Sequence, residues 1–250
     1  MPVGLCSAGF EGENFLCQAN FQPVLTGFGV TPTGGLRQPE LPPQKRAKAV
    51  LLDDREPLIP QYVDACAEAL AEALDSLHRP LLIADFERPF CTAYAALLKI
   101  VAPHAAGLAV PEAYTSIPHD FLFAAPYVPE VSFARWLARR RERLLPDLRP
   151  VAYTASPDGE GALEAASIPA IGSLLRQHPS RVFDAPTLLC RYFSYLENGK
   201  PVFVFFDDKA SLARRLKALS GAGVEQVVVL SEEYGQAAEL ELCVFAAECS

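Results

Sequence analysis

The sequence has little positive charge and no long apolar run. Its 250 residues carry 22 Lys and Arg against 30 Asp and Glu, a net charge of −8. Nucleic acids and anionic membrane surfaces require a basic patch, so this balance argues against both partners. No apolar run reaches the roughly 20 residues that cross a bilayer, which argues against membrane insertion. The first residues show no signal peptide, so we expect a cytoplasmic protein.

Motifs for metals and nucleotides are also missing. The four His are far apart in the sequence, and none has the spacing of a zinc-ligand pair, so we expect no metal site. The seven Cys are odd in number and include no C-x-x-C pair, which favours reduced, buried thiols. The glycines form neither G-x-G-x-x-G nor a P-loop, which argues against an open doubly wound sheet.

Short apolar segments alternate with amphipathic ones along the chain. This pattern is typical of β-α units around a parallel sheet whose strands are buried on both faces. The predicted main-sheet strands are residues 2–8, 15–21, 47–54, 80–87, 107–112, 121–127, 150–154 and 227–231. The predicted helices are residues 59–77, 92–101, 132–145, 168–177 and 211–219. We therefore predict an α/β protein that forms one (β/α)8 TIM-like barrel over residues 1–250. An open doubly wound sheet is the alternative.

Two segments depart from this alternation. Residues 26–48 are rich in Gly and Pro and are predicted to form a long loop. Asn198-Gly199 lies between two aromatic runs and is a strong hairpin signal, so we predict a small inserted β-hairpin within residues 181–207. Asp207 or Asp208 is expected to cap the helix that follows.

Two carboxylates end an apolar strand. Asp85 and Glu87 follow Leu81-Leu82-Ile83-Ala84, and residues two apart on a strand point to the same side. We expect both carboxylates at the carboxyl rim of the barrel, where barrel enzymes carry their catalytic groups, with Phe86 packed outward against a helix. Crowding raises the pKa of at least one carboxyl, which can then protonate a leaving glycosidic oxygen. Capping of the next helix is the alternative role.

Further acids and aromatics are candidates for the same rim. Glu112 and Asp53 end predicted strands, and Tyr153 lies near the end of another. We consider all three as substrate-binding residues, with helix capping or surface solvation as the alternative.

The context of Asp85 and Glu87 resembles a known family. Residues 82–89, LIADFERP, resemble the catalytic strand of glycoside hydrolase family 18 and are closest to its spore-cortex-lytic, peptidoglycan-acting branch. Residues 168–230 are similar to the family in the order of helix, hairpin, Phe-Phe-Asp-Asp segment, helix and final apolar strand. The resemblance covers about residues 80–230.

This resemblance implies a barrel that acts on N-acetylglucosamine-containing glycans of the chitin or peptidoglycan type. Glu87 would protonate the leaving group. Asp85 would orient the substrate's own acetamido group, which serves as the nucleophile. The resemblance implies neither a cofactor nor a metal, and it suggests a spore-associated role.

The chain departs from the family pattern in four places. The first two acids of D-x-x-D-x-D-x-E fall on Pro80 and Ile83. A Tyr-Asp pair at the end of the sixth strand is represented only by Tyr127, which we take as a candidate substrate-binding residue. The last strand usually ends in Trp, whereas residues 230–232 are Leu-Ser-Glu. The one Trp, Trp136, is expected to pack against the barrel.

Three hypotheses follow. The first is a family 18-like glycosidase. The second is a non-catalytic, carbohydrate-binding or structural descendant of the same barrel. The third is a barrel enzyme that uses the same carboxylates on unrelated substrates.

Overall fold

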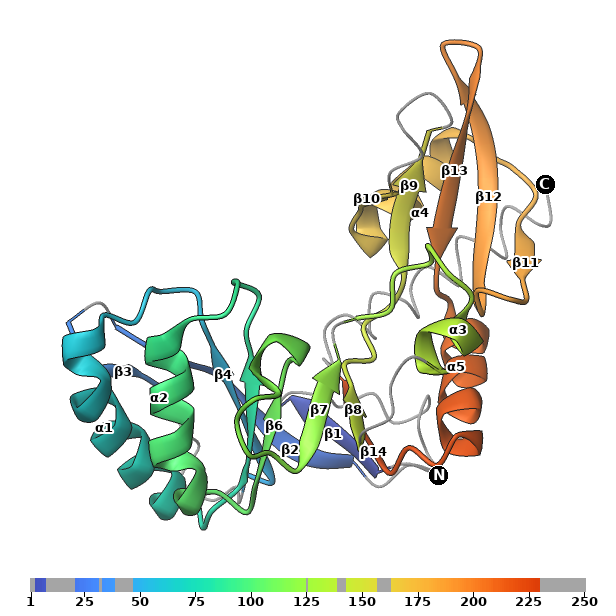
Figure 1. Ribbon diagram of the computed structural model, residues 1–250. Helices are drawn as coiled ribbons and strands as arrows, with labels where there is room; N and C mark the ends of the chain where they lie inside the picture. The colour runs from blue at the N-terminus through green and yellow to red at the C-terminus, as the bar shows by residue number, and fades with distance from the viewer. Residues whose placement is uncertain are drawn as a thin grey trace.

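The computed structural model describes residues 3–7, 21–31, 33–38, 47–124, 126–138, 143–156 and 163–229. Within these residues, eight parallel strands form one row in the order β14-β1-β2-β4-β5-β6-β7-β8 (Figure 1). Their bounds are β1 Val3–Ser7, β2 Phe21–Val30, β4 Ala49–Asp53, β5 Leu81–Asp85, β6 Gly107–Val110, β7 Phe121–Ala124, β8 Leu144–Pro146 and β14 Gln226–Val229. A parallel bridge joins Asp147 to Val228, and the Leu148 amide donates to the Val228 carbonyl over 2.9 Å. The two end strands therefore meet, as the predicted (β/α)8 barrel requires.

Apolar side chains from alternate strand positions fill the barrel interior. Successive side chains on a strand point to opposite faces, so every second residue points inward. The interior cluster consists of Val24, Ala49, Leu51, Leu81, Ile83, Ala109, Phe121, Phe123, Leu145 and Val228. On β5 the inward residues are Leu81 and Ile83. Asp85 is next in this series and ends the strand, so it faces the carboxyl mouth of the barrel.

Two amphipathic helices cover the outer side of β4, β5 and β6 (Figure 1). Helix α1 (Val63–Ser76) follows β4 after the short turn η1 (Pro60–Tyr62), and helix α2 (Thr92–Val101) follows β5 and continues into η2 (Ala102–His104). Apolar residues recur at helical spacing and are buried against the strands, as the pattern predicts. In the described part of the chain, no helix is long and apolar enough to span a membrane.

Two further helices, α3 (Phe133–Ala138) and α5 (Lys209–Gly221), contribute to a second apolar cluster outside β7, β8 and β14. Trp136 is buried in this cluster and stacks on Phe133, with ring centroids 5.2 Å apart. The prediction that Trp136 packs against the barrel is confirmed.

A second, antiparallel sheet is inserted between β8 and α5 and projects from the barrel (Figure 1). Its described strands are β9 Ala152–Ala155, β10 Leu163–Ala165, β11 Phe183–Ala185, β12 Cys190–Glu197 and β13 Lys200–Phe206, in the order β10-β9-β13-β12-β11, with helix α4 (Ile168–Gln177) between β10 and β11. Ile171 of α4 packs with Phe193 of β12. The predicted hairpin joins β12 to β13, and its turn residues Asn198 and Gly199 have φ values of 53° and 79°, as a type I′ turn requires.

The inserted sheet is larger than the predicted hairpin of residues 181–207, because it begins at β9. Residues 152–155 form β9 and belong to the inserted sheet, so the barrel strand predicted at residues 150–154 is wrong. The seventh barrel strand is β8, which lies where the pattern predicts the end of a helix over residues 132–145. Leu145 fills the barrel interior, and Pro146 cannot continue a helix because it lacks a backbone N–H. The helix is limited to α3 within the described residues.

The segment over residues 26–48 is only partly a loop. Strand β2 continues through Val30, although the pattern places a strand at residues 15–21 and a loop from residue 26. The register shifts between Leu25 and Phe28, and Gly27 has φ of 88°, so a bulge lets the strand continue. Residues 36–37 form β3, which pairs antiparallel with β2. Residues 39–46, like residues 15–20 and 230–232, lie outside the described residues.

Candidate functional site

Asp85 lies at the carboxyl mouth of the barrel, with 24% of its side chain exposed. Burial raises its pKa, and the nearby positive charge of Arg149 opposes this effect. The carboxylates of Glu87, Asp53 and Asp54 raise the pKa further. Asp85 is therefore an acid in a crowded, partly buried site, which is the environment predicted for a functional carboxyl.

The positive charge beside Asp85 comes from a residue that the sequence pattern did not single out. Arg149 follows β8, which is separated from β5 by two strands in the barrel. Its Nε lies 2.7 Å from Oδ2 of Asp147, and its Nη2 lies 3.6 Å from Oδ2 of Asp85. Asp147 is 2% exposed and Arg149 is 27% exposed. The guanidinium thus links carboxylates on two non-adjacent strands at the mouth.

Glu87 lies in the loop after β5, and its side chain is exposed. Because the strand ends at Asp85, the alternation that predicts a shared face does not extend to Glu87. Asp54 holds the backbone of this loop: the amides of Glu87 and Arg88 donate to its two carboxylate oxygens at 3.0 and 2.9 Å. Asp54 is 4% exposed. Glu87 therefore projects toward solvent from an anchored segment at the carboxyl side of the barrel.

An aromatic cluster supports the same loop. Phe86 packs outward, as predicted, with its ring centroid 4.6 Å from Tyr94 and 5.2 Å from Tyr114. The Tyr114 hydroxyl accepts a hydrogen bond from the Cys91 amide at 2.9 Å. Phe90 lies 5.0 Å from the Tyr114 ring and is 47% exposed. Phe90 was not among the residues predicted for the site, and its signal in the sequence is an aromatic residue three positions after Glu87.

Asp53 is adjacent to Asp85, as the parallel register of β4 and β5 requires. Arg37 of β3 donates to both of its carboxylate oxygens at 2.6 Å, and the Arg55 guanidinium lies 3.7 Å away. A Cβ atom at Gly29 would lie 2.5 Å from Nη2 of Arg37. Glycine at this position therefore leaves room for the ion pair. Asp53 lies on the predicted rim, where its charge is balanced by arginine.

The remaining candidates lie in different environments. Glu112 is exposed in the short turn η3 (Glu112–Tyr114) that follows β6. Tyr153 of β9 is half-buried, and burial raises its pKa, with smaller effects from Glu130, which raises it, and Arg149, which lowers it. Tyr153 packs against the outer apolar cluster that contains Phe133 and Trp136, and it lies close enough to Arg149 for the guanidinium to act on its pKa.

Tyr127 is not on the rim. It is buried in the outer apolar cluster with Phe133 and Trp136, and its hydroxyl donates to the Val131 carbonyl at 2.5 Å. Strand β7 ends at Ala124, so Tyr127 lies three residues beyond the strand, outside its alternation. Tyr127 therefore has a packing role in the outer cluster, and its prediction as a substrate-binding residue is wrong.

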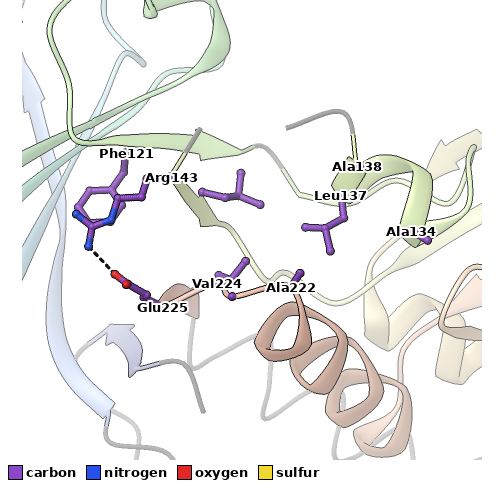
Figure 2. A pocket seen from close by; sticks show the side chains of 10 residues that line it. Phe121, Ala134, Leu137, Ala138, Arg143, Ala222, Val224 and Glu225 are labelled. Carbon is purple, nitrogen blue, oxygen red and sulfur yellow. Dashed lines mark hydrogen bonds and ion pairs between the residues drawn. The ribbon is translucent and has the colours of Figure 1, made fainter. Parts of the chain in front are cut away.

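A hollow of about 440 Å³ lies at the opposite end of the barrel (Figure 2). It is bounded by α3, by residues 222–225 after α5 and by the first residues of β7 and β8, which are Phe121 and Leu144. The Arg143 guanidinium lies 4.6 Å from the Phe121 ring centroid and pairs with Glu225 at 2.5 Å. The hollow is separate from the carboxylates at the mouth, because the amino ends of the strands border it.

Among the described residues, no group of three or more His, Cys, Asp or Glu side chains is arranged to hold a metal ion. Cys66 and Cys190 are buried free thiols, and Cys91 is a half-buried one. Burial raises the pKa of Cys66, and it raises that of Cys190 to about 11. Both buried thiols are therefore protonated at neutral pH.

No family model and no curated protein matches this chain. Solved structures do match. The chain is similar to the spore cortex-lytic enzyme SleL of Bacillus cereus, with a TM-score of 0.62 and 14% identity, over 97% of this chain and 73% of that one. It is similar to a class V chitinase from Nicotiana tobaccum, with a TM-score of 0.62 and 10% identity, over 99% of both chains. A GH18 chitinase from Cycas revoluta matches with a TM-score of 0.56 and 10% identity, over 90% of this chain and 91% of that one.

At sequence identities of 10–14%, the similarity to these structures establishes the fold alone. The chain has a (β/α) barrel fold of the glycoside hydrolase family 18 type, and its structural neighbours include spore-cortex-lytic enzymes. The fold that the sequence resemblance implied is confirmed.

Proposed function

We propose that this protein is a glycoside hydrolase-like barrel that acts on N-acetylglucosamine-containing glycans of the chitin or peptidoglycan type. The observation that carries the proposal is the position of Asp85-Phe86-Glu87 at the carboxyl end of the fourth barrel strand, with Asp85 facing the mouth. A fold of the family 18 type supports it, because a Cycas revoluta GH18 chitinase was solved with bound (GlcNAc)3. The partner we propose is a glycan, rather than a nucleic acid or a membrane.

In this proposal Glu87 is the general acid. It protonates the glycosidic oxygen as the bond to the anomeric carbon breaks. Asp85 accepts a hydrogen bond from the acetamido N–H of the substrate, which directs the acetamido oxygen toward the anomeric carbon as the nucleophile. Asp54 positions Glu87 through the two backbone amides of the loop.

Sugar rings stack on exposed aromatic side chains, and the barrel mouth needs such a surface. We propose Phe90 for this role, because it is exposed, lies in the loop of Glu87 and is backed by Tyr114. Glu112, Asp53 and Tyr153 remain proposed substrate contacts.

A second candidate function is glycan binding without hydrolysis. The observation that favours it is the ion pairing at the mouth: Arg37 engages Asp53 and Arg149 lies beside Asp85. Exposure of Glu87 also favours it, because a catalytic acid usually needs a partly buried site that keeps it protonated. For either function we propose a spore-associated site of action, because the structural neighbours include spore cortex-lytic enzymes. A cytoplasmic site is the alternative.

Hydrolysis of a chromogenic N-acetylglucosamine oligomer and of peptidoglycan glycan strands tests the two functions. We expect Glu87→Gln to lower kcat by about 100-fold or more, because amide replacement removes the transferred proton. The control is Glu72→Gln, an exposed residue on the outer helix α1, which should leave kcat unchanged.

Wild-type turnover no faster than that of Glu87→Gln would refute the hydrolase. Calorimetric titration of wild type and Glu87→Gln with the same oligomers then tests the second candidate function, glycan binding without hydrolysis. Heat of binding for both proteins supports a non-catalytic glycan-binding barrel, and its absence in both refutes glycan binding.

A further inference from the structure

The residue directly behind Asp85 on the inward face of β5 is Ile83, which is fully buried. An apolar side chain cannot share a proton with a carboxyl. The family pattern has an acid at this position, so the usual partner of Asp85 is missing from its own strand. The structure supplies a different partner from the other side of the mouth, the guanidinium of Arg149.

The two contacts of Arg149 differ in kind. The 2.7 Å separation from Asp147 is a close ion pair with a carboxylate that is almost completely buried. The 3.6 Å separation from Asp85 is longer than a hydrogen bond. Asp147 therefore anchors the guanidinium, and Arg149 acts on Asp85 through its charge while leaving the Asp85 oxygens available to another donor.

The other charged groups that act on Asp85 are acidic. Asp53 and Asp54 come from the end of β4, and Glu87 comes from the loop after β5. Asp147 reaches the mouth from the end of β8, where Arg149 neutralises it. Burial and neighbouring acids both favour a protonated carboxyl, and a positive charge within about 4–6 Å favours the ionised form.

We infer that Arg149 is a positioning residue that keeps Asp85 a carboxylate, so that Asp85 accepts a hydrogen bond from the N–H of a bound acetamido group. A carboxylate only accepts hydrogen bonds, whereas a protonated carboxyl also donates one. Asp147 holds the Arg149 guanidinium in place. Ile83 is apolar, so β5 itself offers Asp85 no charged partner on its inward face. The identity of the donor rests on the proposed function, but the charge coupling between Arg149 and Asp85 does not.

Carboxyl-carbon NMR titration of Asp85 in the free protein tests the coupling. Arg149→Gln removes the charge and keeps a donor toward Asp147, so the pKa of Asp85 should rise. Arg149→Lys keeps the charge and should restore a pKa close to that of the wild type. Arg143→Gln removes an equal charge at the amino end of the barrel and should leave the titration of Asp85 unchanged.

An Asp85 titration that is the same in wild type and Arg149→Gln would overturn the inference. If Arg149→Gln does not fold, the double variant Asp147→Asn with Arg149→Gln, which leaves no uncompensated carboxylate at residue 147, is compared with Asp147→Asn alone. A rise in the pKa of Asp85 that Arg143→Gln also produces would likewise overturn it, because the effect would then reflect net charge alone.

The pH dependence of kcat tests the positioning role of Arg149 separately from the NMR titration. If the wild type hydrolyses glycans, the acidic limb of its kcat profile should move to higher pH in Arg149→Gln, because Asp85 must be ionised and its pKa is higher. An unmoved limb would contradict the positioning role. If the wild type hydrolyses nothing, the proposed hydrolase fails, while the NMR titration still decides the coupling.

Discussion

At the scale of single residues, position along a strand separates Asp85 from Glu87. Asp85 is the last residue of β5 and follows Ile83 on the inward face, so it is half-buried among charges. Glu87 lies two residues past the strand and is exposed, with its backbone held by Asp54. The two acids therefore have different environments: burial raises the pKa of Asp85, whereas Glu87 is exposed, which favours glycan binding without hydrolysis.

Phe90 permits a prediction at this scale. We expect Phe90→Ala to weaken binding of N-acetylglucosamine oligomers by about 5- to 150-fold, because loss of a stacking ring costs about 1–3 kcal/mol. Phe90→Tyr keeps the ring and should retain the affinity.

Calorimetry measures both variants, with Leu196→Ala as the control. Leu196 is also an exposed apolar residue, but it lies on β12 of the inserted sheet. Equal affinity of Phe90→Ala and wild type would remove Phe90 from the site.

At the scale of elements, local hydrogen bonds define where α5 begins. The sequence leaves Asp207 and Asp208 as alternative caps, and the structure assigns the cap to Asp208. Its carboxylate accepts from the Ser211 amide at 2.8 Å, and the Ser211 hydroxyl accepts from the Asp208 amide at 2.9 Å. Asp208 also pairs with Arg191 of β12 at 2.9 Å. The cap therefore also connects α5 to the inserted sheet.

Two substitutions separate these roles of Asp208. Asp208→Ala should lower the free energy of unfolding by at least about 1 kcal/mol, since both the cap and the ion pair are lost. Asp208→Asn keeps a good capping oxygen and should lose less, because only the charge is removed.

Urea unfolding followed by circular dichroism measures both. Equal losses in the two variants would assign the stabilisation to the Arg191 pair rather than to the cap.

At the scale of the whole molecule, a buried ion pair joins the barrel to the inserted sheet. Arg215 of α5 pairs with Asp207, which follows β13, and both side chains are fully buried. Asp207 also accepts from the Val151 amide at 2.7 Å, and Arg215 donates to the Arg149 carbonyl at 3.1 Å. The pair thus holds both chain segments that cross between the two sheets, and one of them carries Arg149.

Removing one partner of this pair leaves a buried charge. Arg215→Met should lower the free energy of unfolding by about 3–5 kcal/mol, because Asp207 then lacks its counter-charge. The double variant Asp207→Asn with Arg215→Met should be more stable than Arg215→Met alone, since neither charge of this pair remains.

Chemical denaturation compares the single and the double variant. If the double variant is no more stable than the single one, the uncompensated charge of Asp207 is not the cause of the loss.

The sequence by itself determined the barrel fold, the bounds of two helices and the hairpin turn. Helical spacing and strand-like apolar runs are local signals, so α2 and α4 have the bounds that the sequence predicts. Asn198-Gly199 is likewise local, because only the turn residues need positive φ. The LIADFERP segment identified the fold type and placed Asp85 on the fourth barrel strand.

Only the tertiary structure decided which strand completes the barrel and what surrounds the acids. Residues 144–146 and 150–154 are both short apolar segments, and closure of the ring, rather than propensity, selects β8. Arg149 contacts Asp85 from 64 residues away in the chain, and Arg37 reaches Asp53 through a β2–β3 pairing within a segment expected to be a loop. Such long-range ion pairs depend on how strands are arranged around the barrel, so no local pattern predicts them.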